Sequence, residues 1–407
     1  MSGALSHLRV LDLTRILAGP WATQSLADLG ADVIKVERPK VGDDTRQWGP
    51  PWVRDASGRD TGDSTYYTST NRNKRSITID IAKPEGQALV RELAAGCDVF
   101  AENYKVGDMK RFGLDYAALS KINPRIVYCS VTGYGQDGPY ASRPGYDYVF
   151  QGEGGLMSIT GEREDRPGGG PMKVGVAVTD IVTGLYATIA ILAAIEHRNV
   201  SGRGQHVDMA LLDTIVAFSA NQINGYLTSG KVPGLVGNAH PNMVPYQPFH
   251  TADGRIIIAC GNDGQYQRLC EIIERPDLAA DPRYRTVADR VTHREALLPE
   301  LERSLAAKPT AYWADRFVDA GIPSGPINNF KQVFEHPQVI HRGMRVEMPH
   351  PAGGVLPMAA SPLRLSETPV EYRHVPPLLG QHTQEVLEQL LGKSKSDIDS
   401  LRRNGVI

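Results

Sequence analysis

The chain has 407 residues, 41% hydrophobic and 22% charged, which is ordinary for a globular protein and long enough to favour two domains. The net charge of −2, with no basic run longer than NRNKR (71–75), argues against nucleic acid as a partner. The four cysteines show no CxxC spacing, so we expect reduced thiols in a cytoplasmic protein. The longest apolar stretch, 181–195, is too short to cross a bilayer, and we expect no membrane partner.

The first 131 residues alternate between strand-like and helical patterns. Proline in the first turn and glycine at the end delimit two predicted helices, 20–29 and 84–95. Strands are predicted at 9–13, 32–37, 76–81, 98–102 and 125–131. Because strands that alternate with helices pair in parallel, we expect an α/β fold whose Rossmann-like parallel sheet is covered on both faces.

Two further helices are expected to complete this first domain. One of them is predicted over 207–226, and the other lies before it in the chain. Helical spacing after residue 180 predicts a core helix, with five apolar side chains on its buried face: Ile181, Leu185, Ile189, Leu192 and Ile195.

The composition changes near residue 230. There FHTADGRIIIACG (249–261) predicts a hairpin with an Asp-Gly turn. Helical patterns follow it at 266–274, 294–307 and 312–320, and a last one lies at 382–391. We therefore expect a large α/β domain over 1–228, a smaller α+β domain over 229–330, and a C-terminal segment, 331–407, that returns to the large domain.

Asp180 is the candidate functional residue that the local pattern presents most clearly. It follows a glycine-rich loop and a short apolar segment, 174–178, predicted as a strand, and it begins the apolar helix. An aspartate at a helix start is most often a cap for the first-turn N–H groups. It is also a possible nucleophile, because the helix dipole favours the ionised form and carboxylates attack activated electrophiles such as thioesters. The residues alone leave both interpretations open.

Other motifs have weaker functional interpretations. GYGQDG (133–138) matches a dinucleotide-binding pattern, but Pro139 follows where that pattern needs a helix, so we expect no NAD site. NRNKR is either a solvated surface or a phosphate cradle. His336 and His341 do not share a helical face, so we expect no metal site there. His240 is either a plain surface histidine or part of a loop that covers a site.

The order of motifs along the chain resembles the class III CoA-transferases, the family of formyl-CoA transferase and carnitine CoA-transferase. The motifs are VLDLTRILAGPWATQSLADLGADVIKVERP (10–39), GDDTRQWGPP (42–51), NRNKRSITIDI (71–81), ENYKVGDMKRFG (102–113), GYGQDGP (133–139), the Asp180 segment and PPLLGQHT (376–383). The resemblance covers essentially the whole chain. Within the family, the chain resembles the succinyl-CoA:glutarate branch most, and the motifs DLTRILAGP, STYY, GNAHPNMVPYQ and GPINN carry this resemblance.

The resemblance implies an enzyme that moves CoA from a short-chain acyl-CoA, with succinyl-CoA expected, to glutarate or a related C5–C6 dicarboxylic acid. Asp180 matches the family's nucleophile, which forms an acyl–aspartyl anhydride. No metal and no permanently bound cofactor are implied, since the CoA thioester is itself a substrate. Six residues match the family's CoA contacts: Arg38, Ile79, Asn103, Tyr104, Arg111 and Tyr146.

The acyl pocket is less well defined by the sequence. Trp48 and the Leu17–Ala18 pair match positions that line it, and Asp147 lies in the same region as Tyr146. A diacid also needs a cation for its distal carboxylate. Three side chains are candidates that the sequence does not rank: Arg15, Arg46 and His240.

The chain departs from its relatives at informative positions. Formyl-CoA transferases have Gln at the place of Leu17 and a tetraglycine flap near 237–241, so an oxalate-sized acceptor is not expected. The α-methylacyl-CoA racemases share the fold but use a histidine where this chain has Tyr146, a poor base at neutral pH. A racemase-like enzyme and a non-catalytic acyl-CoA-binding protein are the alternatives. The family also implies a homodimer of two interlocked rings.

Overall fold

The computed structural model describes residues 3–407, which divide into two compact units. The first unit contains the chain up to Leu156, Val174–Thr228 and Ile340–Ile407. The second contains Met157–Lys173 and Ser229–Val339. The segment 157–173 lies in the second unit, where the Gly161 carbonyl accepts a hydrogen bond from the Gly237 N–H and Arg163 bonds Glu295.

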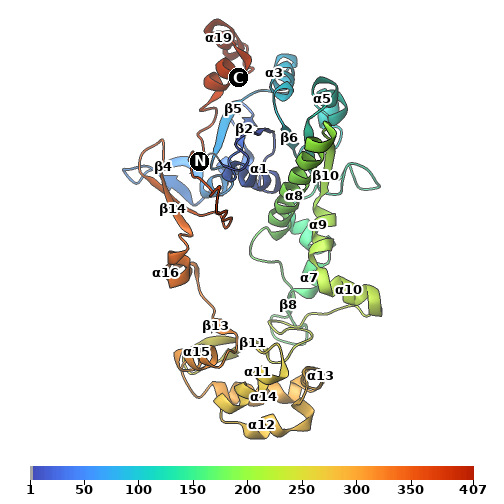
Figure 1. Ribbon diagram of the computed structural model, residues 1–407, viewed down its shortest axis with the longest axis vertical. Coiled ribbons are helices and arrows are strands. Elements are labelled where there is room, and N and C mark those ends of the chain that lie inside the picture. Colours follow the sequence, from blue (N-terminus) through green and yellow to red (C-terminus); the bar gives the residue numbers. More distant parts are fainter. Residues whose placement is uncertain (1–2) are drawn as a thin grey trace. The chain divides into compact units, whose positions relative to one another are not determined.

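A six-stranded parallel sheet organises the first unit (Figure 1). Its strand order is β10-β7-β6-β1-β2-β5, so the chain winds outward from β1 in both directions. The strands are β1 (Arg9–Asp12), β2 (Asp32–Glu37), β5 (Lys74–Thr78), β6 (Val99–Glu102), β7 (Val127–Thr132) and β10 (His206–Ala210). The predicted α/β fold with a parallel sheet is confirmed.

The last strand, β10, replaces the start of a predicted helix. Residues 206–210 pair in parallel with β7, from His206 beside Tyr128 to Ala210 beside Thr132. The helix begins only afterwards, as α9 (Leu211–Phe218) followed by α10 (Ala220–Ser229). The prediction of one helix over 207–226 is therefore wrong, because pairing with a distant strand decides the conformation of five residues whose local pattern is ambiguous.

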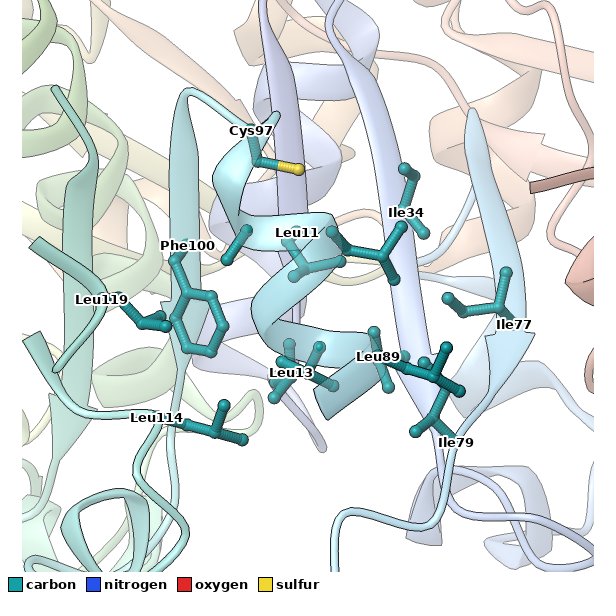
Figure 2. Packing of buried hydrophobic residues seen from close by; sticks show 14 of the residues in the cluster. Leu11, Leu13, Ile34, Ile77, Ile79, Leu89, Cys97, Phe100, Leu114 and Leu119 are labelled. Atoms are coloured by element: carbon teal, nitrogen blue, oxygen red, sulfur yellow. The ribbon is translucent and has the colours of Figure 1, made fainter. Parts of the chain in front are cut away.

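One face of the sheet is covered by α3 (Pro84–Ala95), α5 (Tyr116–Ile122), α18 (Thr383–Leu391) and α19 (Lys395–Arg403). Figure 2 shows the core that results, where Leu11, Ile34 and Phe100 of the sheet meet Leu89 of α3. These side chains are fully buried or nearly so. The C-terminal segment thus belongs to the same core as the first strands.

The other face carries α1 (Ala18–Asp28) and α8 (Val178–Ser201), which lie side by side (Figure 1). The helices approach so closely that a Cβ at Gly184 would lie 2.7 Å from the Ala18 carbonyl oxygen and 3.0 Å from the Trp21 Cβ. Small residues are therefore required on the buried face of α8. This contact also sets the N-terminus of α1 beside the N-terminus of α8.

The buried face of α8 is not the predicted one. Its buried residues include Thr183, Gly184, Ala187, Thr188 and Ile191. Of the five apolar residues expected inside, only Ile195 is buried, whereas Leu185 and Ile189 are 47% and 62% exposed. The expectation that this apolar stretch is too short to cross a bilayer is wrong, because α8 extends beyond 181–195 at both ends. Among residues 3–407, α8 alone is long and apolar enough to cross a membrane, and half of its apolar window is buried in the unit.

The second unit has a three-stranded antiparallel sheet, β11 (Tyr246–His250), β12 (Arg255–Ala259) and β13 (Ser324–Pro326). The predicted hairpin is confirmed, since β11 and β12 pair with Tyr246 opposite Ala259. The predicted helices appear as α11 (Asp263–Ile272), α14 (Arg294–Leu305) and α15 (Thr310–Asp319). The sequence did not indicate β13, which has three residues.

The remaining elements are short. They are η1 (Asp44–Gln47), β3 (Trp52–Arg54), β4 (Asp60–Ser64), α2 (Thr65–Thr68), α4 (Asp108–Arg111), α6 (Asp147–Glu153), α7 (Leu156–Ile159), β8 (Gly161–Glu162), β9 (Gly170–Pro171), α12 (Pro276–Ala280), η2 (Pro282–Tyr284), α13 (Val287–Thr292), α16 (Phe330–Glu335), α17 (Pro337–His341), β14 (Arg345–Pro349) and β15 (Val355–Ala359).

Candidate active site

Asp180 lies in the first turn of α8, but it does not cap that helix. The preceding segment, 174–177, is irregular and not the predicted strand. The residue before the helix, Ala177, has no capping side chain. The cap comes from Asp147 on α6, whose Oδ1 accepts hydrogen bonds from the N–H of Thr179 at 2.7 Å and of Asp180 at 3.4 Å. The capping interpretation of Asp180 is therefore wrong, and its carboxylate is left for another role.

The Asp180 carboxyl group is buried without a hydrogen-bond donor. Its residue is 9% exposed, and no donor within residues 3–407 bonds its side chain. Burial, followed by the negative charge of Asp147, raises the pKa of Asp180 to about 7. Both effects oppose the helix dipole, which favours the charged form. The carboxylate is thus unusually basic for an aspartate and titrates near neutral pH.

Two aromatic residues lie near this carboxyl group. Burial and then the charges of Asp180 and Asp147 raise the pKa of Tyr66 to about 12, so its hydroxyl group stays neutral. Trp48 packs edge-on against Tyr66, with 5.2 Å between the ring centroids. Trp48 thus contacts Tyr66, which in turn interacts with the Asp180 carboxyl group.

A cleft of about 180 Å³ opens beside Asp180. Leu17 and Ala18, at the N-terminus of α1, line it together with Asn103, Tyr104 and Tyr146. The close packing of α1 on α8 explains why residues so far apart in sequence share this wall. Five of the residues that the family resemblance selected therefore surround the candidate nucleophile.

A second cleft, of about 300 Å³, adjoins the first. Arg15 and Tyr104 line both clefts, and we refer to the two clefts together as the trough, which lies at the carboxyl ends of the strands. The second cleft is lined by Arg38, Ile79 and Arg111. Exposed guanidinium groups at one end and a carboxylate at the other suit a long substrate with phosphates and a reactive terminus. All six CoA positions implied by the sequence therefore lie along this trough.

Arg46 lies in a buried network below the trough and lines neither cleft. Its guanidinium group bonds both carboxylate oxygens of Glu37 at 2.9 and 2.8 Å, Asp63 at 3.1 Å and the Tyr67 hydroxyl at 2.6 Å. It also donates to the Pro377 carbonyl at 3.0 Å. These contacts hold the Arg46 guanidinium group inside the domain, so the structure does not place Arg46 at either cleft as a ligand for a diacid.

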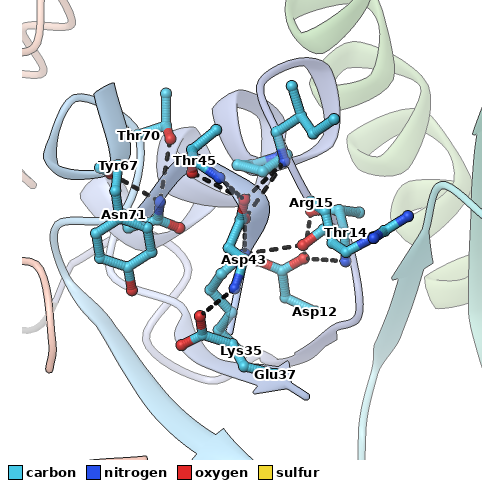
Figure 3. A network of polar contacts seen from close by, with 12 residues as sticks. Asp12, Thr14, Arg15, Lys35, Glu37, Asp43, Thr45, Tyr67, Thr70 and Asn71 are labelled. Atoms are coloured by element: carbon cyan, nitrogen blue, oxygen red, sulfur yellow. Dashed lines mark hydrogen bonds and ion pairs between the residues drawn. The ribbon is translucent and has the colours of Figure 1, made fainter. Parts of the chain in front are cut away.

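The same network explains the NRNKR motif. Lys74 is fully buried against Asp12, and Arg72 is bonded to Asp28. Figure 3 shows the neighbouring part, in which Lys35, also fully buried, meets Asp43 at 2.9 Å. The motif is neither a solvated surface nor a phosphate cradle, because its charges are paired inside the domain.

Comparison with known proteins decides the family. The model of CoA-transferase family III matches residues 5–383. The chain belongs to this family. It is 49% identical over 391 residues to a succinate–glutarate CoA-transferase of Agrobacterium fabrum, covering 95% of each chain. It is 44% identical over 403 residues to the succinyl-CoA:glutarate CoA-transferase of Homo sapiens, covering 99% of this chain and 90% of the human one.

A solved structure shows the same fold. The chain is similar to a CaiB/BaiF family protein of Brucella suis, with 46% sequence identity and a TM-score of 0.84. The match covers 96% of this chain and all of the other. The protein is therefore a class III CoA-transferase, an enzyme that exchanges CoA between acyl-CoA thioesters and carboxylic acids.

Sequence reasoning about this CoA-transferase missed two cations at the site. Lys105 and Arg143 line the cleft beside Asp180, in addition to the predicted Arg15. The Arg143 guanidinium group stacks on Tyr140, 3.6 Å from the ring centroid, and no carboxylate within residues 3–407 pairs with it. The position of Arg143, four residues after the end of GYGQDGP, was the available signal, because loops at the carboxyl ends of parallel strands line binding sites.

His240 belongs to the second unit of the transferase. Its N–H donates to the Tyr246 carbonyl at 3.0 Å, and the Arg294 guanidinium group donates to its carbonyl at 3.2 Å. Burial and then the Arg294 charge lower the pKa of His240, so the imidazole is neutral at physiological pH. Its loop is therefore held in place by the small sheet and by α14.

The titratable residues of the described chain form no evident metal site. Among residues 3–407, no group of three His, Cys, Asp or Glu side chains is placed to hold a metal ion. The four cysteines are free and buried, and burial raises the pKa of Cys97 to about 12. None of them is a reactive thiolate at neutral pH.

Proposed function

We propose that this CoA-transferase moves CoA from succinyl-CoA to glutarate or a related C5–C6 dicarboxylic acid, with Asp180 as the covalent nucleophile. The names of the Agrobacterium and human relatives support the substrate pair. The observation that carries the mechanism is the Asp180 carboxyl group itself, which lines the cleft, is bonded to no donor within residues 3–407 and titrates near neutral pH.

In the proposed reaction, an Asp180 carboxylate oxygen attacks the thioester carbonyl of succinyl-CoA. The C–S bond breaks, and CoA leaves as a thiolate, which carries away the negative charge. The thiolate then attacks the aspartyl carbonyl of the mixed anhydride and releases succinate, which gives an aspartyl-CoA thioester. Glutarate attacks this thioester to form a second anhydride, and CoA thiolate attacks its glutaryl carbonyl. Glutaryl-CoA is released, Asp180 is restored, and no proton is consumed.

Exchange experiments test this proposal directly. Enzyme mixed with succinyl-CoA and isotope-labelled succinate is expected to give labelled succinyl-CoA, and with glutarate it is expected to give glutaryl-CoA, both read by mass spectrometry. A panel of acids of equal length, with one or two carboxylates, defines the acceptor. Failure to form glutaryl-CoA while another acid reacts would contradict the acceptor and leave the transfer reaction intact.

We infer that Arg15 binds the distal carboxylate of the diacid. Its guanidinium group lines the cleft, is bonded to Asp44 at 2.9 Å, and has a buried Nε with no partner within residues 3–407. The Arg15 side chain is 42% exposed, so its guanidinium group is accessible to a ligand carboxylate from the cleft. Asn103 fixes the Arg15 backbone through bonds of 2.9 and 2.7 Å.

The Arg15→Met variant is expected to lose use of diacids while retaining monoacids of equal length. Loss of a charge-assisted contact costs about 2–3 kcal/mol, which corresponds to a fall on the order of 30- to 150-fold in kcat/KM. The measurement is kcat/KM for both acid classes. Arg143→Met is the matched comparison, because it removes another cation from the same cleft. A selective loss of diacids in Arg143→Met alone would assign the contact to Arg143.

We propose that the enzyme is a homodimer in which a second copy covers the apolar face of α8, α9 and α10. Leu185, Ile189, Phe218, Tyr226 and Leu227 are all at least 42% exposed in the isolated chain. An apolar stripe along three consecutive helices is typical of a subunit interface. The interlocked arrangement that the family implies would bury it.

Ile189→Glu is expected to prevent dimer formation, since it places a charge in the centre of that face. Because interlocked rings cannot separate while folded, the variant is refolded from denaturant and its mass is measured by sedimentation. We expect a monomer or an aggregate, whereas wild type gives a dimer. Val318→Glu is the control, because Val318 is 65% exposed on α15 of the second unit. A normal dimer from Ile189→Glu would contradict this interface.

A further inference from the structure

We propose that Asp147 is a positioning residue for Asp180, which fixes the start of α8 and also holds a second negative charge beside the group to be acylated. This inference rests on the proposed role of Asp180 as nucleophile. It assigns to Asp147 a function in the reaction without contact with the acyl group, since Asp147 is not among the residues that line the cleft.

Hydrogen bonds hold both oxygens of the Asp147 carboxylate. Oδ1 accepts from the N–H of Thr179 at 2.7 Å and of Asp180 at 3.4 Å. Oδ2 accepts from Gln151 Nε2 at 2.7 Å. Gln151 is fully buried, and its Oε1 accepts from the Val174 N–H at 2.8 Å. One carboxylate therefore links α6, the loop before α8 and the first turn of α8 into a single hydrogen-bonded unit.

This arrangement determines where the nucleophile points. Helix α8 has no capping side chain of its own at Ala177, so its first N–H groups depend on Asp147. Since one of these groups is the N–H of Asp180 itself, the cap bonds directly to the residue whose side chain must reach the thioester. A small displacement of that residue would misalign the attacking oxygen.

The charge of Asp147 has a separate effect on the covalent step. Asp147 from α6 and the neutral Tyr66 from α2 interact with the Asp180 carboxyl group, and the cations Arg15, Lys105 and Arg143 line the same cleft. When Asp180 attacks the thioester, a C–O bond forms, the C–S bond breaks, and the electron pair and charge leave on the CoA sulfur. The repulsion between Asp147 and Asp180 then disappears, because the anhydride is neutral. The like charge therefore favours the acylated enzyme over the free one.

Two variants separate the cap from the charge. Asp147→Asn keeps an oxygen that can accept from Thr179 but removes the charge and the bond from Gln151 Nε2, whereas Asp147→Ala removes all three. In wild type, kcat/KM is expected to rise with pH through a midpoint near 7, as Asp180 ionises. In Asp147→Asn, that midpoint is expected to move down by on the order of one pH unit, because the like charge is gone while burial remains.

The covalent intermediate provides the second measurement. Enzyme is mixed with succinyl-CoA and quenched with hydroxylamine, and the modified Asp180 peptide is quantified. Asp147→Asn is expected to accumulate several-fold less adduct than wild type at pH 8, where Asp180 is ionised in both. Asp147→Ala is expected to show the same pH shift together with a lower kcat. Asp315→Asn, an exposed aspartate on α15, is the matched control and is expected to match wild type in both assays.

The possible failures are distinguishable. If wild type yields an Asp180 adduct but Asp147→Asn has an unchanged pH midpoint and adduct level, the positioning role of Asp147 is wrong and the nucleophile stands. If wild type yields no Asp180 adduct, the proposed mechanism fails and this inference fails with it. Thermal melting of each variant checks that the fold is intact.

Discussion

Replacing Asp180 by asparagine or alanine is expected to lower CoA transfer by at least about 10³-fold, because no other residue within 3–407 that lines this cleft carries a carboxylate for anhydride formation. The fold and the affinity for CoA are expected to change little. The cap of α8 is provided by Asp147, and the cleft that we propose for most of CoA is lined by other residues. The effect should therefore appear in kcat, with KM and the melting temperature near their wild-type values.

The measurement is glutaryl-CoA formation by mass spectrometry, together with CoA binding and melting of each variant. Asp213→Asn is the matched control, since Asp213 lies in the first turn of another helix, α9, and is exposed. Hydroxylamine trapping should modify Asp180 in wild type and not in the variants. Full activity of Asp180→Asn, after peptide mapping has excluded deamidation to aspartate, would overturn the proposed mechanism.

The alternation of strands and helices could be predicted because it depends on local pattern. The strand Asp32–Glu37 and the helix Pro84–Ala95 appear with the predicted bounds, since both are delimited by their own glycine or proline residues. Residues 206–210 could not be predicted in this way. Their conformation depends on pairing with β7, a strand about eighty residues earlier in the chain.

The face of α8 shows a different limit of sequence reasoning. Apolar residues at helical spacing indicate which side of a helix avoids water, but not whether the sheet or another surface covers it. Here the sheet side needs small residues, such as Gly184 and Ala187, because α1 approaches closely. The larger side chains, such as Leu185 and Ile189, lie on the opposite side and are exposed in the isolated chain.

Family motifs select residues that the structure places beside the two clefts, whereas contacts between residues far apart in the chain could not be predicted. Arg38 and Tyr104 follow β2 and β6, and a resemblance is enough to find them. The cap on Asp180 comes from Asp147, more than thirty residues away, and no local pattern relates the two. Arg46 had the right charge for the pocket, but its acidic partners Glu37 and Asp63 hold it inside the domain.

Lys35→Met is expected to destabilise the first unit by about 3–5 kcal/mol, the effect of breaking a buried ion pair from one side. Lys35 Nζ is fully buried and donates to Asp43 Oδ2 at 2.9 Å and to the Thr14 carbonyl at 2.8 Å (Figure 3). The variant leaves a buried carboxylate without its cation. Asp43 also accepts from the N–H of Ile16, whose φ of 73° is strained for a β-branched residue.

The free energy of unfolding in denaturant tests this expectation, and two further variants define its cause. Lys121→Met, an exposed lysine on α5, is expected to change stability by no more than about 0.5 kcal/mol. Lys35→Met combined with Asp43→Asn is expected to recover part of the loss, since the uncompensated charge is gone. Recovery of activity would lag behind, because the turn before Leu17 depends on the Asp43 carboxylate.

The stability difference between wild type and Lys35→Met is expected to depend on pH. Burial raises the pKa of Asp43, but the Lys35 charge and the hydrogen bonds outweigh it, so the pKa lies below its usual range. A carboxylate with a lowered folded-state pKa contributes stability that is present above its unfolded value of about 4 and is lost as pH falls through the folded one. The difference between wild type and Lys35→Met should therefore be largest near neutral pH and shrink below about pH 4. A difference that stays constant with pH would show that Lys35 stabilises the domain by packing alone.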